Sequence, residues 1–421
     1  MMSDVVIIGG GPAGSALGAY LSKAGISNTI FEGSIHPREH VGESLVMSTI
    51  RVFKDLGFLD KMETESFVRK YGAAWHAPNG KEFGAPFDQI EQEGIGQVYT
   101  YHVDRAKFDM LLLKHADQMG SKVYQGVHVK RILMDGTRAT GVRVSVAGQE
   151  IDVPAKMVID ASGRSTILGN QLRLKKKDPI FDQYAVHTWF TGVNRGSGPS
   201  EDYIHIYFLP VERGWVWQIP ITEEITSIGV VADKKVFREA FSELETYFYN
   251  NLQTNPRLIE AMANATQIKG FETEGDYSYS MQQFVGDGWM MVGDAARFVD
   301  PIFSSGISVA LYSAKFAAEQ IQQAFESGDF SEAALKPYED TLRRGVEVWY
   351  EFIRLYYKLL PLFTHFIQSP KHRLGVMRLL QGEVFDREEV PVLKAMREYI
   401  KAVEESDSHI LKDQLTAIPI D

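Results

Sequence analysis

The first 32 residues have the pattern of a strand, a helix and a second strand, and this pattern restricts the fold more than any other feature. Residues 4–8 form a short apolar run, as a buried parallel strand requires. A helical stretch follows and ends near Gly25, and residues 28–31 predict a second strand that ends at Glu32. Two strands joined by a helix in this way form a βαβ unit. We therefore expect an α/β fold built around a parallel sheet.

A glycine-rich turn lies between the first strand and the helix. Gly9, Gly11 and Gly14 form the pattern G-x-G-x-x-G. In this pattern the first glycine permits a tight turn, the second lets the backbone approach a pyrophosphate, and the third lets the helix pack on the strand. Pro12 and Ala13 lie in the first helical turn, whose free N–H groups and partial positive charge favour a phosphate. The turn thus predicts a site for a dinucleotide phosphate.

The acid at the end of the second strand completes this pattern. Glu32 lies about 20 residues after the first glycines, where a carboxylate accepts hydrogen bonds from ribose hydroxyl groups. With strand, helix, second strand and acid in order, the sequence predicts an adenine dinucleotide site. The alternative is a glycine-rich turn in an ordinary α/β protein. The unit by itself leaves both NAD and FAD open.

Composition and charge exclude several classes of protein. The net charge of -11 argues against a nucleic-acid partner, because phosphate binding requires a basic surface. The chain has no cysteine, which excludes disulfides and thiolate metal ligands. We expect a cytoplasmic protein, since a strand starting at residue 4 leaves no room for a signal peptide and no apolar run reaches about 18 residues. His36 and His40 have helical spacing, but Pro37 between them makes a metal pair improbable, and we expect no metal.

The rest of the chain alternates between strand and helix patterns without a clear linker, which suggests lobes that are interleaved in sequence. We expect helices over residues 45–70 and 104–119, a three-stranded meander over 122–153, and further strands at 156–160, 184–232 and 289–292, followed by helices from 307 onward. Residues 346–367 are rich in aromatic side chains. A packed helix pair explains them better than a helix on a membrane surface, because charged residues and Pro361 interrupt the apolar run.

In three later segments, a turn of small residues follows a predicted strand, and these turns resemble further parts of the dinucleotide site. They are residues 158–164, 292–296 and 300–306. Each is an ordinary turn when taken alone. Their order behind G-x-G-x-x-G resembles the FAD-dependent monooxygenases of the p-hydroxybenzoate hydroxylase type. The resemblance implies FAD as the tightly held cofactor, with ligands that include Arg105, Gly163, Asp294, Pro301 and Gly306.

A short tryptophan motif narrows this resemblance. Trp215, Trp217, Ile219 and Pro220 match W-x-W-x-I-P, which is similar to the motif of flavin-dependent halogenases. Alternate residues of a strand point to one face of a sheet, so an aromatic core is the other interpretation. The halogenase resemblance implies that Trp215 and Trp217 stand near the flavin and hinder ordinary monooxygenation.

Two further segments agree with the halogenase resemblance. Glu43 and Ser44 match a G-E-S loop of this group, and the resemblance places both at the cofactor. Lys70 falls where the halogenase lysine is expected. A lysine with a lowered pKa in a mostly dry pocket would suit the capture of hypohalous acid. A solvated surface charge is the alternative, since Arg69 and Lys70 are adjacent and one of them can simply be exposed.

The segment from residue 301 to 306 departs from the tryptophan halogenases. Phe303 stands where those enzymes have a glutamate, so the variant resembles halogenases that act on phenols or pyrroles, often tethered to carrier proteins. The resemblance implies that Ser305 and Gly306 cradle the halide through backbone N–H groups. Ser162 replaces the aspartate of single-component hydroxylases, from which we infer that a partner reductase delivers reduced flavin.

These inferences combine into one expected architecture and function. A discontinuous Rossmann-like FAD-binding domain (1–75, 98–180 and 270–330) is interleaved with a mixed or antiparallel substrate-binding sheet domain (76–97 and 181–269), and 331–421 form a C-terminal helical region. We expect reduced FAD, O2 and halide to halogenate an electron-rich aromatic ring. Two alternatives stay open, an aromatic monooxygenase or geranylgeranyl-reductase-like flavoprotein, and an FAD-binding module without catalysis.

Overall fold

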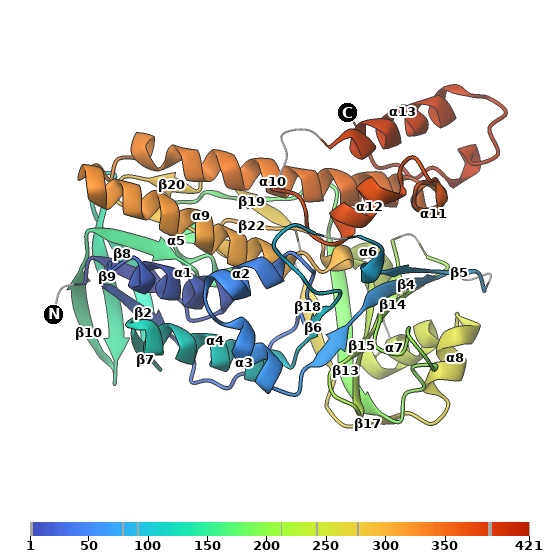
Figure 1. Cartoon of the computed structure of the whole chain (residues 1–421), viewed down its shortest axis with the longest axis horizontal. Helices are drawn as coiled ribbons and strands as arrows, with labels where there is room; N and C mark the ends of the chain where they lie inside the picture. The colour runs from blue at the N-terminus through green and yellow to red at the C-terminus, as the bar shows by residue number, and fades with distance from the viewer. Residues whose placement is uncertain are drawn as a thin grey trace.

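A mainly parallel sheet carries the first part of the fold in the computed structural model (Figure 1). The structure describes residues 3–77, 80–90, 92–211, 213–240, 243–275, 278–385 and 390–420. The strand order of this sheet is β20-β21-β11-β1-β2-β7, and only β20 runs antiparallel to its neighbour. The pairing of β1 with β2 confirms the predicted βαβ unit. The strands are β1 (Val5–Ile8), β2 (Asn28–Glu32), β7 (Lys122–Gln125), β11 (Met157–Asp160), β20 (Val285–Gly286) and β21 (Trp289–Met291).

Helices cover this sheet. α1 (Pro12–Lys23) packs against both α4 (Arg105–Met119) and α9 (Gly306–Ser327). The predicted helix over 104–119 is confirmed, with Asp104 as its N-cap, because the carboxylate accepts a hydrogen bond from Ala106 N–H at 2.9 Å. The helix ends at Gly120, whose left-handed φ of 119° suits glycine.

The expected helix over residues 45–70 is wrong in its second half. The chain forms two short helices, α2 (Thr49–Asp55) and α3 (Leu59–Thr64), and then the strand β3 (Val68–Lys70). Gly57 separates the helices with a φ of 65°, a left-handed conformation that ends a helix. β3 pairs antiparallel with β6 (Thr100–His102), so Lys70 lies on a strand rather than on a helix.

The predicted meander forms from later residues than expected. β8 (His128–Asp135), β9 (Arg138–Val146) and β10 (Gln149–Pro154) are its three strands. Residues 122–125 instead join the parallel sheet as β7, because Gly126 turns the chain with a φ of 72°. The meander thus covers one end of the central sheet (Figure 1).

A large, mainly antiparallel sheet stands beside the central one, in the order β17-β13-β16-β15-β14-β4-β5, with β18 paired to β13. α6 (Lys234–Ala240) and α7 (Leu244–Leu252) pack on one face, where Val216 joins a separate apolar cluster, and α8 (Pro256–Met262) follows α7. The strands are β4 (Gly72–His76), β5 (Glu82–Pro86), β13 (Gln183–Thr191), β14 (Ile204–Phe208), β15 (Trp215–Pro220), β16 (Ile225–Asp233), β17 (Thr266–Gln267) and β18 (Glu272–Gly275).

The remaining elements are one small sheet and the C-terminal helices. The sheet has the order β12-β19-β22, formed by β12 (Lys175–Lys177), β19 (Tyr279–Met281) and β22 (Arg297–Phe298). α5 (Ile167–Gln171) follows β11. The C-terminal helices are α10 (Glu332–Lys358), α11 (Leu360–Gln368), α12 (Arg373–Leu380) and α13 (Pro391–Glu405). The division into three domains stays a prediction, and β4 crosses its proposed boundary at residue 75.

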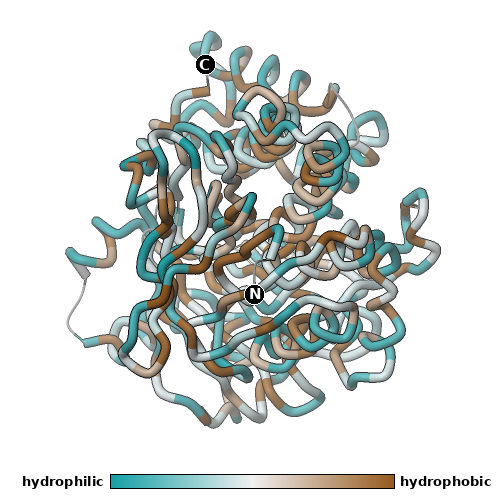
Figure 2. The backbone as a smooth tube through the Cα atoms, turned by 90° about the vertical axis from the view of Figure 1, so that its left-hand side faces the viewer, coloured by the Kyte–Doolittle hydropathy of each residue, from teal (hydrophilic) through white to brown (hydrophobic). Residues whose placement is uncertain are grey.

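The aromatic stretch 346–367 packs in the interior, as the helix-pair interpretation predicts. Its side chains lie on α10 and α11 and surround Phe303, whose ring centroid is 4.5 Å from that of Phe352. Pro361 sits in the first turn of α11, where its missing N–H costs nothing. Hydropathy along the backbone shows the same division between apolar segments inside and polar turns outside (Figure 2). Within the described ranges, no helix combines the length and the apolar character needed to cross a membrane.

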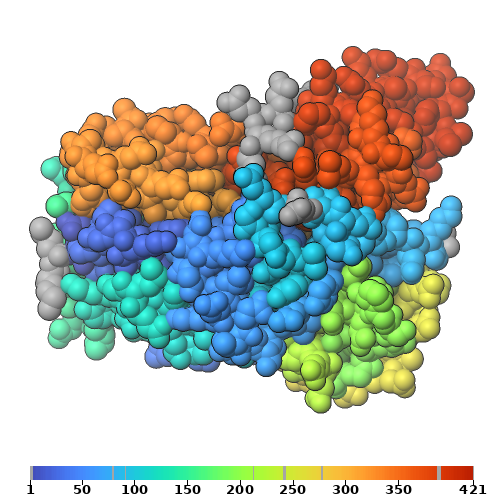
Figure 3. All heavy atoms as spheres, viewed as in Figure 1, coloured from blue at the N-terminus to red at the C-terminus, as the bar shows by residue number. Residues whose placement is uncertain are grey.

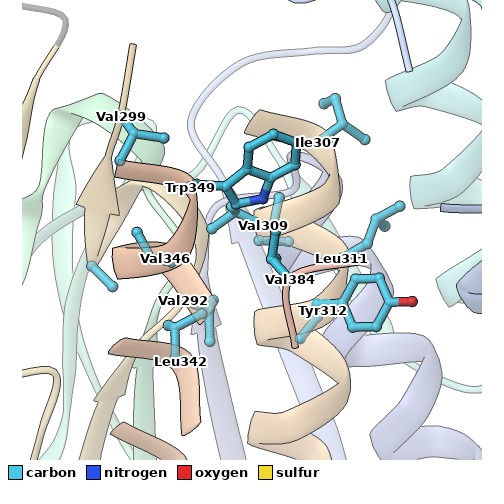
Figure 4. Close-up of a cluster of buried hydrophobic side chains, with 14 of the residues drawn as sticks. Val292, Val299, Ile307, Val309, Leu311, Tyr312, Leu342, Val346, Trp349 and Val384 are labelled. Atoms are coloured by element: carbon cyan, nitrogen blue, oxygen red, sulfur yellow. The ribbon is translucent and has the colours of Figure 1, made fainter. Parts of the chain in front are cut away.

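Trp349 occupies the middle of the packing between α9 and α10 (Figure 4). Its side chain is completely buried, and Val309 and Val346 lie around it. We expect Trp349→Ala to lower the free energy of unfolding by about 3–5 kcal/mol, because truncation leaves a large cavity. Urea denaturation followed by circular dichroism measures this change.

The matched control is Ile259→Ala on α8, where the side chain is half exposed. We expect this control to change the free energy of unfolding by less than about 0.5 kcal/mol. Equal losses in the two variants would contradict the assignment of Trp349 to the core.

Candidate active site

A cavity of about 580 Å³ extends from the carboxyl ends of the parallel strands to the face of the large sheet. Nearly all residues predicted to hold the cofactor line it. They are Gly9, Gly11, Pro12, Ala13, Glu32, Glu43, Ser44, Arg105, Gly163, Asp294, Pro301 and Gly306. Gly14 is the exception, and its place in α1 agrees with a packing role. The structure therefore brings together residues that are up to about 300 positions apart in the sequence.

The end of the cavity beside α1 is shaped for a nucleotide. Glu32 accepts hydrogen bonds from Gly10 N–H at 2.7 Å and Ser34 N–H at 2.8 Å, which fixes the carboxylate at the cavity wall. A Cβ at Gly14 would lie 2.0 Å from the carbonyl oxygen of Gly9, so only glycine lets the helix approach the turn. A Cβ at Gly11 would meet nothing closer than 3.6 Å, so this position is open toward the cavity.

Arg105 and Asp294 place opposite charges in the lining of the cavity. The Arg105 guanidinium donates to both carboxylate oxygens of Asp109, at 2.8 and 2.9 Å, and to the carbonyl oxygen of Val41 at 2.6 Å. These contacts hold the side chain against the wall. Burial raises the pKa of Asp294 to about 6, and Arg105 and Arg164 oppose this shift. In a cofactor with both phosphate and sugar groups, Arg105 would attract the phosphate and Asp294 would accept hydrogen bonds from the sugar hydroxyl groups.

The two tryptophans form the other end of the cavity. Trp215, Trp217 and Ile219 alternate along β15 and all line the cavity, while Val216 between them points into the apolar cluster under α7. The Trp217 indole N–H donates to Ser227 Oγ at 3.1 Å. Gly229 on β16 leaves room for this ring, since a Cβ there would lie 2.1 Å from it. The motif thus forms a cavity wall as well as part of the sheet.

Glu43 is a buried acid in the wall between these two ends. The Trp189 indole N–H donates to Glu43 Oε1 at 2.8 Å. Burial raises the pKa of Glu43 to about 7, and its hydrogen bonds with Ser227 and Trp189 act in the opposite direction. A carboxyl group with this pKa can give or take a proton near neutral pH.

Lys70 lies behind this loop and is not among the residues that line the cavity. Its side chain is only 2% exposed, and its ammonium donates to the carbonyl oxygen of Leu45 at 2.8 Å. Burial lowers the pKa of Lys70 to about 7. Arg69 next to it is 50% exposed and pairs with Glu63 at 2.7 Å. The exposed cation of this adjacent pair is therefore Arg69.

The segment from Asp300 to Gly306 builds the start of α9. Asp300 accepts a hydrogen bond from Ile302 N–H at 3.0 Å, so it acts as a turn cap rather than a cavity residue. Gly306 lines the cavity, and a Cβ there would meet nothing within 4 Å. Ser305 is completely buried, and its hydroxyl has no hydrogen-bond partner among the described residues. Free N–H groups at a helix start can bind an anion.

The residues present fit FAD. The cavity is lined both by an acid that can bind a ribose, Glu32, and by two aromatic rings, Trp215 and Trp217. Ser44 Oγ belongs to a cavity residue, is buried, and has no hydrogen-bond partner within the described ranges, which is what a bound polar group would supply. The glycine turn accommodates a pyrophosphate without a side chain in the way. The lining of this cavity therefore fits FAD, because it offers an acid for a ribose at Glu32 and aromatic rings at Trp215 and Trp217.

Sequence reasoning missed several cavity residues. Arg38, His40, His128, Ile204 and Phe298 also line it. Ile204 and Phe298 come from sheets whose packing no local pattern reveals. Arg38 and His40 follow Glu32 by a few positions, so their closeness to a ribose-binding acid was the one available signal. In the part of the chain that the structure describes, no three acidic or histidine side chains gather as metal ligands.

The two glycines of the turn give a matched test of this assignment. We expect Gly14→Ala to lower the free energy of unfolding by about 1–3 kcal/mol, because its Cβ collides with backbone. We expect Gly11→Ala to fold normally but to bind FAD more weakly by at least about tenfold, since it blocks the approach of the pyrophosphate. Urea denaturation and FAD fluorescence titration separate the two effects. Tight FAD binding by Gly11→Ala would contradict the placement of the pyrophosphate.

The lowered pKa of Lys70 predicts how stability depends on pH. In the unfolded chain the amine keeps its proton up to about pH 10, whereas in the folded chain it loses it near pH 7. Between these values the unfolded state binds more protons, so folding becomes more favourable as pH rises. We expect the free energy of unfolding, wild type minus Lys70→Met, to rise by up to about 1.4 kcal/mol per pH unit from pH 7 to 10. A flat difference over this range would show that Lys70 stays charged.

Comparisons with known proteins agree with this geometry. A family model described as tryptophan halogenase matches residues 88–361, and one described as FAD dependent oxidoreductase matches residues 4–170. The 1H-pyrrole-2-carbonyl-(peptidyl-carrier protein) chlorinase of Pseudomonas fluorescens is 44% identical over 97% of this chain and 95% of its own length. The corresponding brominase of Pseudoalteromonas luteoviolacea is 32% identical over 96% of this chain and 97% of its own length. The solved structure of the flavin-dependent brominase Bmp2 has a TM-score of 0.88 at 31% identity, and covers 96% of this chain and 99% of that one.

These matches separate the alternatives that the sequence left open. They favour halogenation over an aromatic monooxygenase, a geranylgeranyl-reductase-like flavoprotein and a non-catalytic module. They also confirm FAD as the cofactor and the fold predicted from the motifs. The chain belongs to the flavin-dependent halogenase family and is an FAD-dependent halogenating enzyme.

Proposed function

We propose that the protein halogenates a pyrrole- or phenol-type ring that a carrier protein presents as a tethered group. The observation that carries the halogen transfer in this proposal is the buried amine of Lys70, whose pKa of about 7 leaves much of it uncharged at neutral pH. It lies directly behind the Glu43–Leu45 loop that borders the FAD cavity. An uncharged amine is a nucleophile, whereas a solvated ammonium is not.

Different residues along the cavity bind the cofactor and the halide. Glu32, Gly11 and Arg105 hold the ADP half of FAD. Bound reduced FAD supplies, with O2, the oxidising power that turns a halide into hypohalous acid. The N–H groups at the start of α9, beside Ser305 and Gly306, hold the halide close to the ring end of the cavity.

Trp215 and Trp217 fill the space beside the flavin ring. Because they occupy the end wall, a substrate ring has no room next to the flavin and direct hydroxylation is disfavoured. To reach Lys70, hypohalous acid passes from the cavity through the Glu43–Leu45 loop, behind which the amine is buried. At Lys70 the amine nitrogen forms a bond to the halogen and water leaves. The ring carbon then takes the halogen, and the ring proton returns to the amine nitrogen.

Proton transfer at the cavity is assigned to Glu43. Its pKa of about 7 lets it hold a proton or release one at the pH where Lys70 is partly uncharged. Trp189 on β13 and Ser227 on β16 hold the carboxyl group at the face of the large sheet, in the wall of the cavity. The carboxyl thus supplies protons where water is largely excluded.

The substrate class follows from the α9 segment and from the relatives. Phe303 packs into the aromatic core between α10 and α11, so no acid stands at that position to assist the attack on a weakly activated ring. A phenol or pyrrole activates its own ring. The names of the chlorinase and brominase that resemble this chain give a pyrrole-2-carbonyl group on a peptidyl-carrier protein as the substrate. This similarity supports a tethered substrate here. Ser162 stands where single-component hydroxylases have an aspartate, and this supports delivery of reduced FAD by a separate reductase.

The direct test supplies reduced FAD, O2 and chloride or bromide to the purified protein, with a panel of phenols and a carrier loaded with pyrrole-2-carboxylate. We expect halogenated product by mass spectrometry, and a loss of at least about a hundredfold in Lys70→Met, because no amine remains to hold the halogen. Arg69→Met on the same strand is the matched control and should retain activity. Undiminished halogenation by Lys70→Met, or oxygenated product without halide, would refute the proposal.

A further inference from the structure

A second and smaller cavity, of about 90 Å³, lies next to the FAD cavity, and we call it the side cavity. Glu43 and His40 line both cavities, so the two share a wall. The start of α4 borders the side cavity on one side, and β13 and β18 of the large sheet border it on the other. Figure 3 shows the N-terminal part of the chain (blue) beside the large-sheet part (green to yellow), and the side cavity is formed between these two parts.

Two buried polar atoms in the lining of the side cavity have no hydrogen-bond partner among the described residues. They are Glu43 Oε2 and His187 Nε2. Glu43 is 2% exposed and His187 is 5% exposed. Buried polar atoms normally bond to protein or to ordered water. Because the side cavity has room for several water molecules, water is the partner that suits both atoms.

His187 connects the tryptophan wall with the outer side of this cavity. Its ring centroid lies 5.6 Å from that of Trp217, and it is the cross-strand neighbour of Glu272. The 3.9 Å between His187 Nε2 and Glu272 Oε2 is too long for a hydrogen bond, but a water molecule can bond to both. Burial lowers the pKa of His187 to about 4, and Lys269 acts in the same direction. The ring is therefore neutral at neutral pH, and one nitrogen can accept a proton while the other releases one.

A pair of carboxyl groups lies at the outer side of the cavity. Glu39 and Glu272 reach solvent and hydrogen-bond to each other, which requires one of the two to hold a proton. Lys269 Nζ lies 2.7 Å from Glu39 Oε1 and lowers the pKa of Glu39. Burial and the bond with Glu39 raise the pKa of Glu272. The shared proton therefore belongs to Glu272, which is the member of the pair next to His187.

The chemistry of halogenation requires a supply of protons. Overall, neutral reduced FAD, O2, one halide ion and one proton give oxidised FAD, water and hypohalous acid. O2 takes two electrons from reduced FAD and two from the halide, its O–O bond breaks, and one oxygen atom bonds to the halogen. The halide enters without a proton, and the later transfer of the halogen to the ring supplies none. Each turnover thus takes one proton from the solvent.

We propose that the side cavity is the proton inlet of the enzyme, in which water leads from the Glu39–Glu272 pair past His187 to Glu43. This proposal rests on the proposed role of Glu43 in proton transfer, and it adds the route by which Glu43 regains its proton. Bound FAD and the tryptophans fill the larger cavity. A separate inlet lets protons enter without bringing bulk water to the flavin site.

A crystal structure of the FAD-loaded protein tests the inlet without any turnover. We expect ordered water in the side cavity, within hydrogen-bond distance of Glu43 Oε2 and His187 Nε2. Gly270→Met blocks the inlet, because Gly270 lines the side cavity and a Cβ there would meet nothing within 4 Å. We expect this variant to lose the water and to keep FAD in place. A dry side cavity in the FAD-loaded wild type would overturn the proposal.

Kinetics test whether the inlet delivers the proton. The measured quantity is the rate at which the enzyme with reduced FAD, O2 and bromide forms hypobromous acid, trapped by monochlorodimedone with no ring substrate present. We expect Gly270→Met and His187→Ala each to lower this rate at least about tenfold, because Glu43 regains its proton slowly. Gly84→Met is the matched control. Gly84 is exposed on β5, and the nearest heavy atom to a Cβ there is 3.8 Å away, so this variant should keep the wild-type rate.

Added imidazole separates the supply of protons from a structural defect. It should restore most of the lost rate to His187→Ala, because it enters the space of the missing ring and carries protons there. It should not restore the rate to a His187→Ala, Gly270→Met double variant, whose side cavity is filled. Absence of rescue in the single variant, or equal rescue in both, would overturn the proposal.

The outcomes distinguish the inlet from the proposed function. A wild-type rate of hypobromous acid formation in Gly270→Met and His187→Ala overturns the inlet, even if the enzyme halogenates a tethered ring. If the wild type forms hypobromous acid but halogenates no tethered ring, while both variants are slow and imidazole rescues His187→Ala, the proposed substrate fails and the inlet stands.

Discussion

An amine that leaves water loses its proton more easily, and the burial of Lys70 depends on several parts of the structure at once. Strand β3 brings it inward, the carbonyl oxygen of Leu45 orients it, and the ring of Phe87 covers it. Burial lowers its pKa to about 7. Removing an ammonium from water costs several kcal/mol, and the lowered pKa lets the buried amine lose its charge near neutral pH. In the proposed function, the same burial makes the amine a nucleophile at neutral pH.

The parallel sheet brings together cofactor-binding residues from distant parts of the chain. The carboxyl ends of β1, β2 and β11 lie at one edge, as expected for a nucleotide site in an open α/β sheet. Asp160 at the end of β11 accepts hydrogen bonds from Ser162 N–H at 2.9 Å and Leu168 N–H at 2.7 Å, and so shapes the second turn. The large sheet then meets this edge with the face that carries both tryptophans.

Local patterns in the sequence predict the parts of this site that depend on neighbouring residues. The βαβ unit, the cap at Asp104 and the alternation along β15 follow from spacing that a few residues determine. The helix expected over 45–70 was wrong because one left-handed glycine, Gly57, outweighs a regular apolar period. Cavity residues such as His128 depend on packing between sheets, which no local period reports. The hydrogen bond from Arg373 to the Gln89 side chain joins residues 284 positions apart, and no local pattern in the sequence reveals it.

We propose that one cavity holds both FAD and the halide, with the halide at the start of α9. Crystals of the FAD-loaded protein grown in bromide test it most directly, because bromide gives an anomalous difference signal. We expect a peak within hydrogen-bond distance of the N–H groups at Ser305 and Gly306, at the flavin-ring end of the cavity. Bound FAD without any bromide at that position, or with bromide held only elsewhere, would contradict it.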